Sequence, residues 1–174
     1  MSDTVRMLHS IVSLDYERPP TLAAREYGAA AREHRLIGHK CKECGRVYTP
    51  PKGYCPICVA PTDKEDEVEL PTTGVLVTYT VLNPDALQAQ GGSSTCRGTV
   101  LLDGTQISIT GEVAVTPEEI HTGMRLRGVW RPVTNEELVN PGWSVPGLDT
   151  WEPTGTPDAD ADEVQRLLNE AGRE

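Results

Sequence analysis

The hydrophobic pattern of the chain has helical spacing near the N-terminus and strand-like alternation in the second half. Thr21 follows Pro19-Pro20 and can cap a helix over residues 22–35. The apolar stripe of this helix has the spacing i, i+4, i+7, i+11 and consists of Ala23, Tyr27, Ala30 and His34. Because small residues dominate the stripe, two alternatives stay open. The helix docks on another subunit with Tyr27 at the interface, or it packs on its own domain through Tyr27 and Leu36.

From residue 74 onward the pattern is that of β-strands. The first strand is long and rich in β-branched residues, and Asp103-Gly104 is a two-residue hairpin turn between two further strands. Thr116, Pro117 and Glu119 combine a capping box with proline at the first helical position, which predicts a short helix. The predicted strands are 74–82, 99–102, 106–113 and 124–133.

Short strands with one short helix before the last long strand are typical of a five-stranded Greek-key barrel of the oligonucleotide/oligosaccharide-binding (OB) type. The fifth strand is expected from residues 67–70 or from a split first strand. Beyond the barrel, residues 140–157 carry Trp143 and Trp151 among proline-containing turns, and residues 158–173 form a short acidic helix. The two tryptophans either anchor a partner or fold back on the barrel.

Four of the five cysteines form two Cys-x-x-Cys pairs separated by ten residues: Cys41/Cys44 and Cys55/Cys58. Together they can supply four thiolates to one tetrahedral ion, and Zn²⁺ is the usual ion in an all-sulfur site. Gly45 follows the first pair, where a tight turn needs positive φ. Four sulfur ligands leave no position for water or substrate, so the predicted zinc is structural. Disulfides, a redox Cys-x-x-Cys and an iron centre are the alternatives.

The chain is therefore predicted to be mainly β, with an N-terminal helix, a rubredoxin-like zinc ribbon and a five-stranded OB-fold Greek-key barrel. Its expected parts are an arm and helix (1–36), the ribbon (37–66), the barrel (67–135) and a tail with an acidic helix (136–174). His39 is a weaker candidate ligand, because four thiolates already complete the site. Cys96 has no histidine near it in the sequence and is expected to be a buried or loop thiol.

Charge and composition narrow the functional classes. The formal net charge of −10 disfavours binding to a phosphate backbone, which requires clustered Lys and Arg. Residues 25–52 are locally basic, with seven Lys and Arg against three Glu, a net of +4. No apolar run approaches the length of a membrane span, and the N-terminus lacks the pattern of a signal peptide. A cytoplasmic protein is expected.

A zinc ribbon that leads directly into such a barrel resembles the zinc-ribbon/OB-fold acyl-CoA-associated proteins, which are small auxiliary subunits of thiolase-like enzymes. The likeness covers about residues 20–135. It is carried by the helix before the ribbon and by Cys41–Arg46, Pro50-Pro51-Lys52, Tyr54–Cys58, Gly74–Val81, Leu102-Asp103-Gly104 and Gly123-Met124.

The resemblance implies a hetero-oligomer, such as an α2β2 assembly, with a thiolase-like partner that carries most of the chemistry. It implies a CoA thioester as the ligand of the complex, and the Ala- and Arg-rich composition favours the steroid side-chain aldolases among the possible enzymes. The small subunit would support the acyl-CoA site. Candidate contacts to acyl-CoA or to the partner are Arg32, Arg35, Lys40, Lys42, Arg46 and Tyr79. For Tyr79, packing in the barrel core is the alternative.

Two other functional classes are weighed against this one. A single-stranded nucleic-acid module is the alternative, because ribbons and OB barrels both occur in such proteins, but it requires a basic groove with exposed aromatic residues. A stand-alone enzyme requires a catalytic dyad, triad or open metal site, and the sequence offers none. The chain alone is therefore expected to be non-catalytic, within a carbon–carbon lyase or acyltransferase complex.

Overall fold

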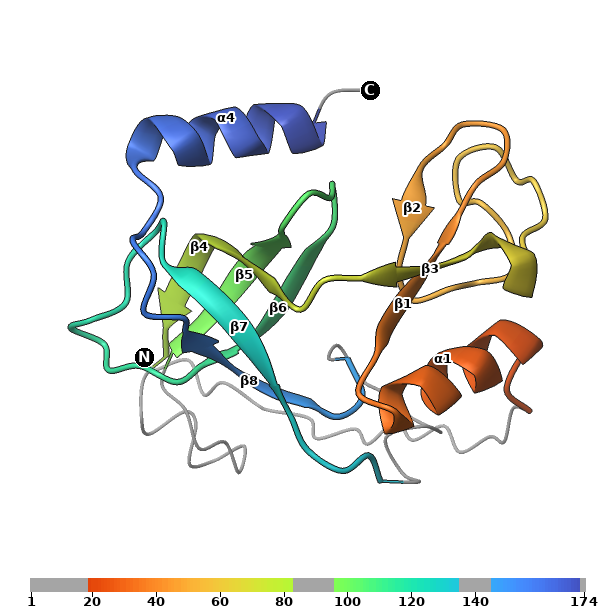
Figure 1. Ribbon diagram of the computed structural model, residues 1–174, viewed down its shortest axis with the longest axis horizontal. Helices are drawn as coiled ribbons and strands as arrows, with labels where there is room; N and C mark the ends of the chain where they lie inside the picture. Colours follow the sequence, from red (N-terminus) through yellow and green to blue (C-terminus); the bar gives the residue numbers. More distant parts are fainter. Residues whose placement is uncertain (1–18, 83–95, 135–144, 173–174) are drawn as a thin grey trace, which may run out of the picture.

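The zinc ribbon and the barrel lie side by side in the computed structural model, which describes residues 19–82, 96–134 and 145–172. Figure 1 shows the ribbon beside the barrel, with one helix near the ribbon sheet and one above the barrel. The elements are α1 (Leu22–Arg32), β1 (Leu36–Lys40), β2 (Val47–Tyr48), the 3₁₀-helix η1 (Lys64–Asp66), β3 (Glu67–Leu70), β4 (Thr73–Val81), β5 (Cys96–Leu102), β6 (Ser108–Val113), β7 (Arg125–Trp130), β8 (Leu148–Pro153) and α4 (Ala161–Gly172).

Helix α1 begins as predicted and ends three residues early. The Thr21 hydroxyl accepts a hydrogen bond from the Ala24 amide at 3.2 Å. The helix ends because His34 takes a positive φ of 57°, and the amide of Arg35 then donates to the Ala30 carbonyl at 2.9 Å. This is the bond pattern of a Schellman motif.

The predicted stripe of α1 packs on the chain itself. Tyr27 and Ala30 are buried in the same apolar cluster as Leu36, and Tyr27 is 8% exposed. Burial raises the pKa of Tyr27 to about 12. Of the two alternatives for this helix, the structure therefore has the one in which Tyr27 packs on its own domain.

The ribbon contains a three-stranded sheet in the order β2-β1-β3. Strand β3 pairs antiparallel with β1, with Leu36 opposite Leu70 and His39 opposite Glu67. The prediction that residues 67–70 supply a barrel strand is therefore wrong. The 3₁₀-helix η1 directs the chain back along β1: the Asp63 side chain accepts from the Glu65 amide at 2.9 Å, and the Asp66 side chain accepts from the Asp63 amide at 3.1 Å.

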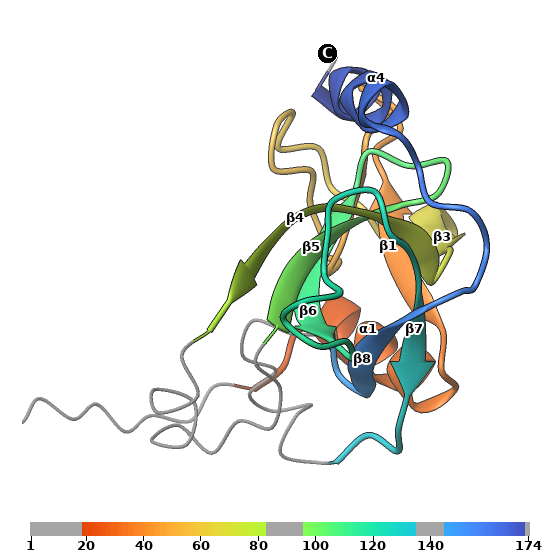
Figure 2. The same ribbon diagram turned by 90° about the vertical axis from the view of Figure 1, so that its left-hand side faces the viewer.

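The predicted five-stranded barrel is confirmed, and it is closed in the order β4-β5-β6-β8-β7. The fourth strand in sequence, β7, pairs with the first, β4, as in a Greek key, and β6 pairs in parallel with β8. Strand β8 is the fifth strand, and it comes from the region assigned to the tail. Figure 2 shows the strands from another side, with β8 beside β7.

The side chain of Trp151 explains why this tail strand joins the barrel. It is 1% exposed and belongs to the main apolar cluster with Leu76, Val100 and Leu126. A Cβ atom on Gly111 would lie 2.7 Å from Trp151 Nε1, so only glycine leaves room for the indole on the neighbouring strand. The structure thus has the alternative in which Trp151 folds back on the barrel, while Trp143 lies outside the described residues.

The short helix predicted from Thr116 is only a turn. The predicted capping contact is present, with Glu119 Oε2 accepting from the Thr116 amide at 3.1 Å. The segment then has to bury Ile120 and reach β4, where the Gly123 amide donates to the Leu76 carbonyl at 2.8 Å. These contacts leave too few residues for a helix.

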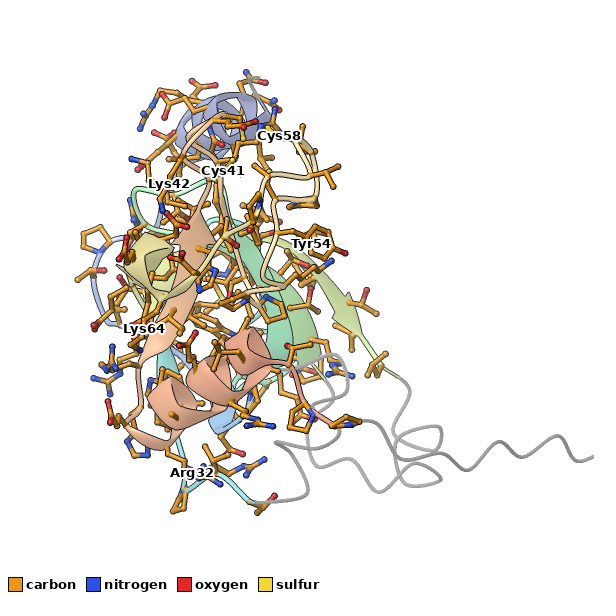
Figure 3. All side chains as sticks on the ribbon, turned by 90° about the vertical axis from the view of Figure 1, so that its right-hand side faces the viewer. Arg32, Cys41, Lys42, Tyr54, Cys58 and Lys64 are labelled. Atoms are coloured by element: carbon orange, nitrogen blue, oxygen red, sulfur yellow. The ribbon has the colours of Figure 1, made fainter. Side chains whose placement is uncertain are left out.

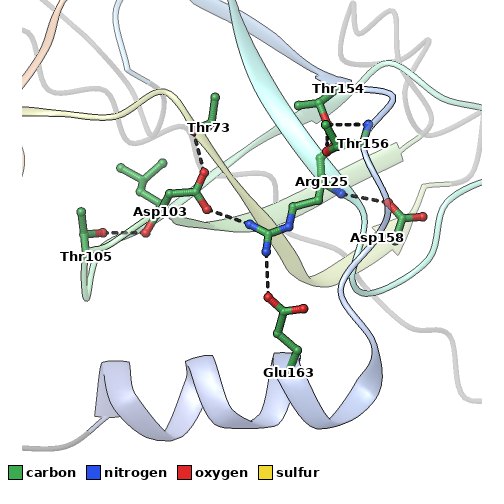
Figure 4. A network of polar contacts seen from close by, with 9 residues as sticks. Thr73, Asp103, Thr105, Arg125, Thr154, Thr156, Asp158 and Glu163 are labelled. Atoms are coloured by element: carbon green, nitrogen blue, oxygen red, sulfur yellow. Dashed lines mark hydrogen bonds and ion pairs between the residues drawn. The ribbon is translucent and has the colours of Figure 1, made fainter.

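Helix α4, shorter than the predicted 158–173, packs against β4. Its Val164 is buried with Val75 and Ala159. Figure 4 shows the polar contacts beside this packing, in which the Arg125 guanidinium bridges Asp103 at 3.0 Å and Glu163 at 2.7 Å. The C-terminal helix is thereby attached to the barrel by both apolar and charged contacts.

Candidate metal centre

The two Cys-x-x-Cys loops, here called the first knuckle (residues 41–46) and the second knuckle (residues 55–60), have the same backbone structure. In each, the first cysteine donates its amide to the carbonyl five residues on and accepts from the amide four residues on. The bonds are Cys41 N to Arg46 O (2.8 Å), Gly45 N to Cys41 O (2.9 Å), Cys55 N to Ala60 O (2.8 Å) and Val59 N to Cys55 O (3.0 Å).

The residue after each second cysteine has a positive φ. It is 71° at Gly45, as the sequence predicted, and 60° at Val59. Glycine adopts this conformation without steric cost, whereas a β-branched residue rarely does. The knuckle geometry therefore requires the left-handed conformation at both positions, whatever residue occupies them.

The four cysteine sulfur atoms form one compact cluster. All lie within 4.8 Å of one another, and Cys44 Sγ lies 3.7 Å from Cys55 Sγ. A tetrahedron with Zn–S bonds of about 2.3 Å has edges of about 3.8 Å, so the cluster has the size of a tetrahedral zinc site. A disulfide needs about 2.05 Å, and all of these cysteines are free. The cluster is closed on the protein side, because Cys41 and Cys55 are buried.

Backbone amides stabilise the thiolate form of Cys55. The amides of Cys58 and Ile57 each donate to Cys55 Sγ at 3.4 Å. The Cys58 amide contributes most to lowering the pKa of the Cys55 thiol to about 7. Hydrogen bonds of this kind stabilise the thiolate, which is the form that binds zinc.

His39, two residues before Cys41, is not among the side chains of the metal cluster. It is fully buried, and its Nδ1 is 3.1 Å from the Thr62 hydroxyl, which also contacts the Tyr48 hydroxyl at 2.8 Å. These three side chains connect β1, β2 and the chain after the second knuckle. They hold together the strands on either side of the first knuckle, which is a supporting role.

Most of the basic residues predicted to contact acyl-CoA or a partner are dispersed or already paired. Arg35 forms ion pairs with Glu33 at 2.9 Å and Glu69 at 3.5 Å, and Lys42 pairs with the buried Asp66 at 3.2 Å. In Figure 3, Arg32 and Lys42 lie at opposite ends of the molecule. The structure does not bring these side chains together into one phosphate-binding site.

Other predicted side chains have clear positions. Tyr79 is 40% exposed on β4, so it does not pack in the barrel core. Lys40 is exposed at the end of β1, and Arg46 is half-buried in the first knuckle. Cys96 is fully buried in the barrel cluster, as one of the alternatives for this thiol required.

Sequence reasoning missed the buried carboxylate of Asp66. Burial raises the pKa of this group, but the Asp63 amide and Lys42 outweigh that effect, and the pKa is lowered overall. The spacing Asp63-x-x-Asp66 resembles a capping box and could have revealed it.

A cleft of about 440 Å³ lies between the first knuckle, the barrel and α4. Its apolar lining includes Leu70 and Leu167, and Asp103 and Glu170 add acidic groups. These acidic side chains do not suit the phosphates of CoA. Within the described residues, no helix is long and apolar enough to cross a membrane.

Comparison with known proteins agrees with this architecture. Residues 29–62 match the family model described as "ChsH2, rubredoxin-like zinc ribbon domain". A "DUF35 domain-containing scaffold protein" of Methanocaldococcus jannaschii is 28% identical over 116 residues, which is 66% of this chain and 81% of that protein.

One solved structure shares the fold, and a second is described as a DUF35 protein. The Ltp2-ChsH2(DUF35) aldolase matches with a TM-score of 0.50 and 22% identity, over 78% of this chain and 98% of that one. A Sulfolobus solfataricus protein of unknown function from the DUF35 family matches with a TM-score of 0.46 and 16% identity, over 62% and 78%.

The fold and the cysteine cluster define a zinc-ribbon protein with an OB-type barrel. More particularly, residues 29–62 match a ChsH2-type zinc ribbon, and the chain is similar to a DUF35 scaffold protein. The likeness to ribbon–barrel proteins of this kind, expected from the sequence, is thereby confirmed for the ribbon and the fold.

Proposed function

We propose that this chain is the auxiliary zinc-ribbon subunit of a thiolase-like acyl-CoA enzyme, with the chemistry mainly on the partner. The observation that carries the proposal is the ribbon–barrel architecture, which is shared with the structure of the Ltp2-ChsH2(DUF35) aldolase. The sequence similarity to a DUF35 scaffold protein supports it. The closed four-thiolate cluster supports it, because a metal held by four sulfurs stabilises a fold and offers no position to a substrate.

The favoured partner is an aldolase or thiolase that acts on steroid or other acyl-CoA side chains in the cytoplasm. The acidic groups in the cleft beside α4 make that cleft unsuitable for CoA phosphates. The acyl-CoA site would therefore lie mostly on the partner, with this chain supporting its edge. Lys40, exposed at the end of β1, is the basic residue best placed to test a contact.

The test is purification of the tagged chain from its native cells, followed by mass spectrometry of the proteins recovered with it. We expect a thiolase-fold acyl-CoA enzyme in fixed ratio, and cleavage of its acyl-CoA substrate that falls when this chain is removed. Lys40→Glu should weaken acyl-CoA binding by the complex if Lys40 contacts the ligand. A chain recovered alone, or with nucleic acid, would contradict the proposal.

A further inference from the structure

The second knuckle and the residues beside it expose an apolar surface that the first knuckle lacks. Tyr54, Ile57 and Val59 are 47%, 62% and 73% exposed, and they are three of the seven large hydrophobic side chains exposed among the described residues. Residues 53–61, here called the apolar knuckle, contain no Asp, Glu, Lys or Arg, although these residue types make up 24% of the chain. The first knuckle, by contrast, contains Lys42, Glu43 and Arg46.

The backbone at Val59 adds an independent observation. Val59 has a φ of 60° and occupies the same place in its knuckle as Gly45 does in the first. A β-branched residue in this conformation is strained, and glycine would relieve the strain. With 73% of its surface exposed, the Val59 side chain contributes little packing within the chain. A strained residue that the fold does not need indicates a function outside the fold.

Resting on the proposed function, we infer that the apolar knuckle is the surface that docks into the thiolase-like subunit, in an uncharged apolar pocket. A pocket with buried charged side chains would be disfavoured, because residues 53–61 offer no Asp, Glu, Lys or Arg to pair with them. The metal holds the knuckle rigid, so little conformational entropy is lost on docking. In Figure 3, Tyr54 lies on one side of the ribbon, and Lys42 and Lys64 lie on the other.

The charge of the chain favours a different protein over a second copy of itself. Two copies would each carry a formal charge of −10 and repel one another. The same charge disfavours an anionic membrane surface. In addition, two protruding knuckles cannot bury each other well, whereas a concave pocket can enclose Ile57 and Val59.

The experiment compares three variants of the full chain in complex with the purified thiolase-like subunit that is recovered with it. Ile57→Ser and Val59→Gly alter the apolar knuckle, and Glu43→Ser is the matched control at an exposed position of the first knuckle. Zinc content and thermal unfolding of each free variant are measured first. We expect full zinc occupancy in all three, and an unfolding temperature for Val59→Gly equal to or above that of the unaltered chain.

Affinity for the partner subunit then decides the inference. We expect Ile57→Ser and Val59→Gly to raise Kd by about ten- to a hundredfold, and Glu43→Ser to leave it within about twofold. If a partner exists and binds both apolar-knuckle variants as tightly as the unaltered chain, this inference falls while the proposed function stands. Failure to recover any thiolase-like partner overturns both. Self-association of the free chain that Ile57→Ser abolishes would assign the knuckle to a second copy instead.

Discussion

The ribbon and the barrel share apolar contacts where they meet, yet each region is stabilised by a different kind of interaction. Among the described residues, the buried polar or charged side chains are His39, Thr62 and Asp66, and all three lie in the ribbon. The barrel interior is apolar, with Trp151 and Leu76 among its fully buried side chains. A ribbon of this kind needs its metal and its polar contacts, whereas the barrel depends on packing.

Removing the metal should be the largest perturbation and should separate the two regions. Structural zinc contributes about 10–16 kcal/mol of apparent binding free energy in small zinc-finger peptides. With a strong chelator we expect amide hydrogen exchange to accelerate across both knuckles, while β4 to β8 stay protected because their core does not include the metal.

The fifth cysteine provides the control for this experiment. Cys55→Ser should abolish zinc binding, and Cys96→Ala should leave the zinc content unchanged, because Cys96 lies in the barrel cluster and outside the metal cluster. If the chelator removed protection from the barrel strands at the same rate as from the knuckles, the two regions would form one cooperative unit, and the contrast between them would not hold.

Trp151→Ala should be the largest perturbation of the barrel by a single side chain. Truncation of a buried aromatic residue in a core costs about 3–5 kcal/mol. We expect chemical denaturation to show a loss of this size, with zinc still bound before unfolding. Trp151→Phe is the control: the indole Nε1 has no hydrogen-bond partner in the structure, so phenylalanine loses volume only and should cost less. An equal loss for both variants would contradict the packing argument.

The sequence predicted the metal site and most of the barrel, because both leave local signals. The cysteine spacing indicates the ligand set, and Asp103-Gly104 indicates the hairpin between β5 and β6. The two-residue loop predicted there is wrong, because β5 ends at Leu102 and β6 begins at Ser108. The fifth strand was missed because the signal for β8 is not local. Its place depends on Trp151, which pairs with Val113 and packs its indole against Gly111, and none of these residues alone indicates a pairing in the sequence.

The left-handed conformation of Val59 could not be predicted for a similar reason. The glycine at position 45 predicts a positive φ from its residue type alone. Val59 adopts a positive φ because the second knuckle has the same hydrogen bonds as the first. The exposure of the apolar knuckle likewise follows from the fold and not from a pattern in the sequence. Sequence reasoning therefore recognised the metal site better than the surface around it.

Exchanging the residues of the two knuckles should have smaller, opposite effects. Gly45→Val should destabilise the zinc-bound chain by about 1 kcal/mol, because φ is positive there, although a Cβ atom at this position would meet nothing within 4 Å. Val59→Gly should leave stability unchanged or raise it by up to about 1 kcal/mol. Thermal unfolding of both zinc-bound variants measures the difference. Two changes of the same sign would show that the knuckles are not equivalent in strain.

The pH dependence of the α4 attachment should be the smallest effect. His121 Nε2 lies 2.9 Å from Asp158, whose other oxygen accepts from the Arg125 amide at 3.1 Å. The Glu119 carbonyl, and then Asp158, raise the pKa of His121 above its usual value of about 6.5. The Arg125 amide, and then His121, lower the pKa of Asp158 below about 3.9.

The signs of these two shifts define a pH window for the attachment. The histidine contribution is complete below about pH 6.5 and is lost as the pH rises through its folded pKa, whereas the aspartate contribution is complete above about pH 4 and is lost on acidification. Protection of the α4 amides should therefore be greatest between these two pH values. The free energy that the contact adds should be less than about 1 kcal/mol, because both side chains are largely exposed. Hydrogen exchange of α4, corrected for the intrinsic rate at each pH, tests this against Asp158→Asn. Protection that increased from pH 6 to 8 would rule out the His121–Asp158 contact as a source of stability.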